Sequence, residues 1–102
     1  MRRESFEKLK ENNTIDCLYP YILRILSEKP THAYVLRKDI EKKFGFRVGP
    51  VTAYKVLYLL KKEGLVEKTQ KGRTKVYRLT SEGEKELQNV LEFYRERIKL
   101  LG

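Results

Sequence analysis

Four glycine positions divide the middle of this chain into segments of different periodicity, and they constrain its fold more than any other feature. The four are Gly45, Gly49 (followed by Pro50), Gly64 and Gly72. Between the second and the third, over residues 51–63, apolar residues recur at helical spacing. Around the fourth, two β-rich runs within residues 65–80 flank a Lys-Gly-Arg turn, which predicts a hairpin. The sequence therefore predicts a helix, a short turn, a second helix and a hairpin, in that order.

Further helices are expected on both sides of this central part. Apolar spacing indicates a short helix over residues 2–11, a second helix capped by Asp16, a third capped by Thr31, and a long last helix from residue 81. Phe46 to Val48 are expected as a short third strand. The fold class is therefore mainly α with a small β-hairpin: a winged helix-turn-helix with an added N-terminal helix and a long C-terminal helix.

The net charge of the chain lies entirely within residues 42–81. That segment holds eleven Lys and Arg against two acids, and the rest of the chain holds twelve of each, so the whole surplus of +9 belongs to it. A surface with such an excess favours a polyanionic partner. Because the same segment supplies the second helix and the hairpin of a winged helix, we expect double-stranded DNA as the partner.

The helix over 51–63 is expected to enter the major groove, since short donors and acceptors near the start of a recognition helix reach base edges. Its expected DNA contacts are Thr52, Tyr54, Lys55 and Lys62. The hairpin over 65–80 is expected to act as a basic wing on the DNA backbone or in the minor groove. Its expected contacts are Lys68, Lys71, Arg73, Lys75 and Arg78.

The last helix carries an apolar stripe with alternating spacings of four and three residues, which is typical of helix pairing. A terminal helix with this much apolar surface either folds onto its own core or pairs with a second copy of the chain. We expect a homodimer, because the first helix offers another apolar surface that needs cover. The expected interface residues are Phe6, Leu9, Leu87, Val90, Leu91, Tyr94, Ile98 and Leu101.

Other classes of function find no support in the sequence. One cysteine (Cys17) and one histidine (His32) exclude an intrachain disulfide and a metal site built from several such ligands. No nucleophile, base and orienting group come together, so we expect neither catalytic residues nor a cofactor. No apolar run approaches the roughly 20 residues of a membrane span, and the charged N-terminus lacks a signal-peptide core. A cytoplasmic protein without a membrane partner is expected.

Three stretches of the sequence, taken in order, resemble the PadR-like family of winged-helix transcriptional regulators. They are ILRILSEKPTHAYVL from residue 22, FGFRVGPVTAYKVLYLLKKEGLVE from residue 44, and GRTKVYRLTSEG from residue 72. The resemblance covers about residues 14–90. It implies a homodimer held by the C-terminal helix, a recognition stretch matching Thr52, Tyr54 and Lys55, and a wing tip matching residues 71–75. Family members typically repress transcription, and some sense phenolic acids or drugs; the sequence leaves any small-molecule effector of this chain undefined.

The chain is thus expected to divide into an N-terminal helix supporting the dimer (1–13), a winged-helix DNA-binding domain (14–80) and a C-terminal dimerisation helix (81–102). Its expected function is sequence-specific transcriptional regulation, as a repressor. Two alternatives remain on the same scaffold. Leu59 and the scarcity of polar base-reading side chains are compatible with a sequence-tolerant architectural DNA-binding protein. A winged helix can also serve as a protein–protein adaptor whose basic face meets an acidic partner.

Overall fold

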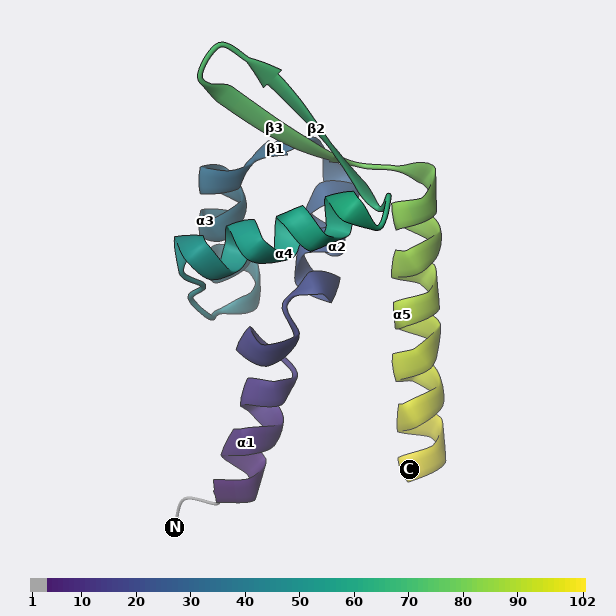
Figure 1. Cartoon of the computed structure of the whole chain (residues 1–102). Helices are drawn as coiled ribbons and strands as arrows, with labels where there is room; N and C mark the ends of the chain where they lie inside the picture. Colours follow the sequence, from purple (N-terminus) through teal and green to yellow (C-terminus); the bar gives the residue numbers. More distant parts are fainter. Residues whose placement is uncertain (1–3) are drawn as a thin grey trace.

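The computed structural model describes residues 4–102; residues 2 and 3 of the expected first helix lie outside them. Five α-helices, one short 3-10 helix and three strands follow one another along this part of the chain (Figure 1). In order, they are α1 (Glu4–Asn12), η1 (Ile15–Cys17), α2 (Tyr19–Glu28), β1 (Thr31–His32), α3 (Ala33–Phe44), α4 (Pro50–Lys62), β2 (Val66–Lys71), β3 (Thr74–Leu79) and α5 (Ser81–Leu101). This mainly helical chain with a small antiparallel sheet confirms the expected fold class.

The core lies around α2, which packs against α3, α4, α5 and the sheet. Ile22 and Leu23 of this helix are completely buried, as are Leu36 of α3 and Leu57 of α4. Each of these helices is apolar on one side only, so burying the apolar sides together removes them from water. Helices α2 and α3 thereby hold α4 in place, and the other side of α4 remains free.

The three-stranded sheet has the order β1-β3-β2, and both pairings are antiparallel. Its third strand is Thr31–His32, opposite Tyr77 and Val76. The expectation that Phe46 to Val48 form this strand was therefore wrong. Thr31 is likewise a strand residue, and His32, not Thr31, stands at the N-cap of α3. A two-residue strand has no sequence signal of its own, because pairing with β3 alone creates it.

The start of α2 also differs from expectation. Asp16 lies in the 3-10 helix, and Leu18 occupies the position before the first residue of α2, without a side-chain cap. Leu18 is buried in the core, and Pro20 stands in the first turn, where its missing N–H is tolerated. Asp16 therefore does not cap this helix, and the buried Leu18 occupies its N-cap position instead.

The first turn of α5 packs closely against the residues that follow α4. The hydroxyl of Thr80 accepts a hydrogen bond from the Gly83 N–H (3.0 Å) and donates one to the Gly64 carbonyl (2.7 Å). Gly83 is buried here, and a Cβ built on it would lie 2.1 Å from the Leu65 carbonyl oxygen. Only glycine therefore fits this point, and α5 leaves the domain in a defined direction.

Two helices extend beyond the winged domain. In Figure 1, α1 and the C-terminal half of α5 project toward the same side, and the described chain measures 51 × 29 × 21 Å along its principal axes. No residue of α1 is buried. Over the part of the chain described, none of the helices is long and apolar enough to cross a membrane.

Candidate nucleic-acid interface

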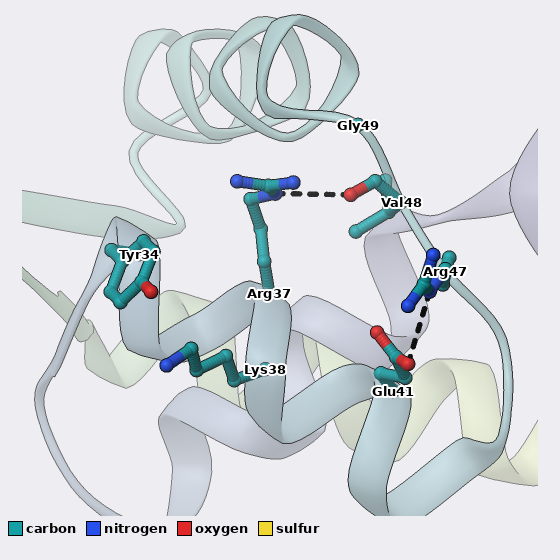
Figure 2. A pocket seen from close by; sticks show the side chains of 7 residues that line it. All are labelled: Tyr34, Arg37, Lys38, Glu41, Arg47, Val48 and Gly49. Atoms are coloured by element: carbon teal, nitrogen blue, oxygen red, sulfur yellow. Dashed lines mark hydrogen bonds and ion pairs between the residues drawn. The ribbon is translucent and has the colours of Figure 1, made fainter.

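The start of α4 is held against α3 by backbone and side-chain contacts. Gly49 precedes the helix with an extended conformation (φ −71°, ψ 158°), and Pro50 fills its first turn. The Arg37 Nε of α3 donates a hydrogen bond of 3.0 Å to the carbonyl of Val48, whose side chain is buried (Figure 2). The turn before α4 is thus fixed from both its backbone and its side chain.

The exposed side of α4 is defined by what its opposite side buries. Ala53, Leu57 and Leu60 face the core. Side chains spaced by four, three and four residues share one helix face, and the face opposite this core contact carries an exposed set of four: Val51, Lys55, Tyr58 and Lys62.

The expected contact residues of α4 are all exposed, but they do not all lie at the centre of its free face. Lys55 and Lys62 lie at the centre of the free face, whereas Thr52 and Tyr54 lie on opposite flanks of it. Leu59 is also exposed and lies on the Thr52 flank. Helix α4 contains no acidic residue, so nothing on it would repel a phosphate backbone.

The register of the hairpin divides the expected wing contacts between its two sides. Paired residues of an antiparallel ladder point to the same side, so Lys68 and Lys75 share the side of the buried Tyr77. Lys71 and Arg78 lie on the other side, where Arg78 stands opposite Glu67. All five expected wing cations, Arg73 of the turn included, are exposed. Gly72 has φ +60° and no other residue of the turn has a positive φ, which suits a tight type II′ hairpin.

A basic hollow of about 400 Å³ lies between α3 and the start of α4. Figure 2 shows Tyr34, Arg37 and Lys38 of α3 lining it, with Arg47 and Glu41 at one edge. The Lys38 ammonium lies 4.5 Å from the centre of the Tyr34 ring, and its hydrogen bond and charge lower the pKa of the Tyr34 hydroxyl.

Sequence reasoning assigned no function to the residues of this hollow. The signal was present, since Tyr34, Lys38 and Glu41 recur at helical spacing on one face of α3. Arg47 of the turn forms an ion pair with Glu41 (3.1 Å). Three cations thus gather beside the first turn of α4, whose N-terminal end also favours negative charge.

The residues expected at a dimer interface fall into three groups. Leu87 and Val90 were assigned to contacts between chains, but both are buried within this one chain. Leu91 and Tyr94 are half-buried, and burial raises the pKa of the Tyr94 hydroxyl. The exposed group consists of Phe6, Leu9, Ile98 and Leu101. The apolar stripe of α5 therefore packs on its own domain first and continues beyond it into solvent.

Among residues 4–102, no group of three or more His, Cys, Asp or Glu side chains is arranged to hold a metal ion. The cations described above are the chemically distinctive groups of this surface.

Residues 22–89 match the sequence model of the PadR-like family of transcriptional regulators. This chain belongs to that family. PadR-like proteins are transcriptional regulators rather than enzymes, and the matched region runs from α2 through the hairpin into α5. No curated protein sequence matches the chain significantly.

Solved structures place this PadR-like chain among winged-helix proteins. It resembles a PadR-like transcriptional regulator from Bacillus cereus (26% identity, TM-score 0.74, covering 90% of this chain and 92% of that one). A transcriptional regulator from Clostridium thermocellum is similar at 24% identity (TM-score 0.76, covering 82% and 88%). F93 from STIV, a winged-helix DNA-binding protein, is similar at 24% identity (TM-score 0.72, covering 80% and 91%). At the two lower identities the likeness concerns the fold alone.

Proposed function

We propose that this PadR-like chain is a homodimeric, sequence-specific DNA-binding repressor acting in the cytoplasm. One observation carries the proposal: α4 exposes a face with Lys55 and Lys62 and no acid, beside a hairpin whose cations are all exposed. That pairing of a free basic helix with a basic hairpin suits a major groove flanked by phosphates.

In this proposal, α4 lies in the major groove and the two parts of the interface have different tasks. The reading residues are Thr52, Tyr54, Lys55 and Lys62. The wing binds the flanking backbone or the minor groove through Lys68, Lys71, Arg73, Lys75 and Arg78. Contacts to base edges carry sequence information, whereas contacts to phosphates carry affinity that falls with salt.

The dimer is proposed from the two projecting helices. Helix α1 has nine residues and buries none of them, although Phe6 is 57% and Leu9 55% exposed. A helix this short is marginal in water unless it packs on something. Ile98, 72% exposed, and Leu101 continue the α5 stripe on the same side of the molecule. A second copy of the chain would cover both surfaces, with residues 1–13 and 81–102 as dimer elements around the DNA-binding domain 14–80.

A dyad between two chains would present two copies of α4 to half-sites roughly 34 Å apart on a pseudo-palindrome. In the proposed repressor role, a protein bound to such a site within a promoter would exclude the polymerase and block transcription. A reporter placed behind the bound site should therefore be less active when the protein is expressed.

DNA binding is tested by fluorescence anisotropy with a duplex selected from a random library and with an unselected duplex, over a range of salt. Lys55→Ala should weaken binding to the selected duplex by about 1–3 kcal/mol and reduce discrimination. Lys71→Ala should weaken both duplexes alike and reduce the salt slope by about one.

Three outcomes contradict the proposal or part of it. If both variants weaken the selected and unselected duplexes equally, α4 does not read sequence. Competition of the two duplexes within severalfold supports an architectural protein instead. Absence of duplex binding at low salt refutes DNA binding and supports an adaptor.

The dimer is tested by sedimentation of Ile98→Asn, because this side chain is exposed and its replacement leaves the core intact. The variant should sediment at the mass of one chain. Tyr58→Asn is the matched control, since Tyr58 is also a large exposed residue (63%) but lies on α4, and it should leave the dimer intact. If the double variant Ile98→Asn/Phe6→Ser sediments at the same mass as the unchanged protein, this interface is refuted.

A further inference from the structure

The free face of α4 is apolar where it begins. Val51, in the first turn, is 80% exposed, and Tyr58, two turns later, is 63% exposed. Exposed single apolar residues are common on proteins. Here, however, Val51 stands one helical turn before Lys55 on the face that the proposed function directs at DNA.

Neither the chain's own packing nor the proposed dimer covers Val51. In Figure 1, α4 begins on the side of the domain away from α5, with α3 beside it. Beside its start lies the basic hollow, in which Arg37, Lys38 and Arg47 outnumber a single acid, Glu41. The occupant of this surface therefore has to combine negative charge with an apolar group.

The major groove of DNA provides both. Phosphates line its edges, and the C5-methyl group of thymine is the apolar group that base pairs present within it. A valine side chain has no donor or acceptor. Placed against the amino group of cytosine or adenine, it would remove water without replacing the lost hydrogen bond. A valine at this point thus selects for thymine by contact and against other bases by desolvation.

We propose that Val51 reads the methyl group of a thymine, and that Lys55 reads the O6 and N7 acceptors of a nearby guanine. This inference rests on the proposed function and names the base that its recognition helix selects. Four helical residues span about 6 Å, or roughly two base-pair steps of about 3.4 Å. Each half-site then contains a thymine within about two base pairs of a guanine.

The test uses the full chain and DNA without the methyl group. Duplexes are first selected from a random library, and each thymine of a selected half-site is then replaced in turn by deoxyuridine, which differs from thymine only in lacking this methyl. Among these single replacements, only the one at the contacted thymine should weaken binding, by about fourfold, the value expected for one buried methyl group. The other replacements should have little effect.

Val51→Ala identifies the protein side of the contact. The variant should bind the thymine duplex several times more weakly than the unchanged protein and should no longer distinguish thymine from deoxyuridine at that position. Val35→Ala is the matched control, because it makes the same change at an exposed valine of α3. It should retain the fourfold discrimination. Non-additivity of the two changes, protein and DNA, measures the contact directly.

The outcomes separate this inference from the function on which it rests. If the library yields no enriched duplex, sequence-specific binding fails and the inference fails with it. If duplexes are enriched but no deoxyuridine replacement matters, the proposed function stands and the thymine contact is refuted. If Val51→Ala still discriminates fourfold, another residue reads the methyl and the assignment to Val51 is overturned.

Discussion

Replacement of Gly83 by alanine should destabilise the protein, although the same change inside a helix normally stabilises it. Gly83 lies in the first turn of α5 and is buried against the end of α4 and the hairpin. An alanine Cβ would lie 2.1 Å from the Leu65 carbonyl oxygen and 2.5 Å from the Leu79 Cδ1. Leu79 can change rotamer, but the Leu65 carbonyl belongs to backbone that accepts the Thr80 N–H at 3.1 Å, so α5 itself has to move.

The magnitude follows from opposing contributions. Replacing glycine by alanine within a helix gains about 1 kcal/mol. Overpacking against backbone costs about 1–3 kcal/mol, and a displaced α5 loses the Thr80 cap, worth about 1 kcal/mol. Gly83→Ala should therefore lower the free energy of unfolding by about 2 kcal/mol. For a chain of this size, that corresponds to a fall in Tm of roughly 10 °C.

Urea unfolding followed by far-UV circular dichroism, at one fixed protein concentration, measures this difference. Gly49→Ala is the control for steric effects. Its φ is negative and a Cβ there meets nothing within 4 Å, so the only expected cost is the preference of the N-cap of α4 for glycine over alanine, at most about 1 kcal/mol. If Gly83→Ala is as stable as the unchanged protein, the close packing of α5 on the Leu65 carbonyl is refuted.

Three further predictions concern single side chains. Arg37→Lys keeps the charge but loses the hydrogen bond from Nε to the Val48 carbonyl. It should weaken DNA binding several-fold in fluorescence anisotropy. Unchanged affinity would show that Arg37 does not position α4 for binding. Burial raises the pKa of the Tyr77 hydroxyl above its ordinary 10.0. The neutral hydroxyl therefore contributes fully to stability below about pH 10, and this contribution is lost as the pH rises through the raised pKa. Tyr77→Phe should reduce this alkaline loss of stability in urea unfolding at increasing pH. Thr80→Ala, which removes the α5 cap, should cost about 1 kcal/mol on unfolding, and no change would contradict the cap.

The parts of the fold with local causes could be predicted from the sequence. Gly45, Gly64 and Gly72 all have positive φ, a conformation that favours glycine. Each therefore marks the end of a helix or the turn of a hairpin before any tertiary contact is known. The α4 helix and the β2–β3 hairpin were predicted correctly for this reason.

The parts with distant causes could not be predicted. The strand Thr31–His32 exists only because β3 lies beside it. The centre of the free face of α4, with Val51 and Tyr58, was not predicted, because the half-burial of Val56 on the opposite side is decided by packing. The hollow lined by Tyr34, Arg37 and Lys38 forms only when α3 meets the start of α4.

The α5 stripe shows how one periodicity can serve two partners. Its early residues, Leu87 and Val90, are buried against their own domain, while Ile98 and Leu101 are free. Sequence spacing is the same in both halves, so it predicts an apolar face but not what covers it.

This division has a mechanical consequence for the proposed dimer. Helix α5 is held to the end of α4 by the Thr80–Gly64 hydrogen bond and by the close fit at Gly83, and it is one continuous helix of 21 residues. A partner that binds its free end would therefore set the direction of α4 as well. The distance between the two recognition helices then depends on α5 and not on a flexible linker. A change at the junction, such as Gly83→Ala, should accordingly alter the preferred spacing of half-sites in DNA selection even at temperatures where the variant is folded. Loss of stability with an unchanged spacing would show that α5 transmits no such constraint.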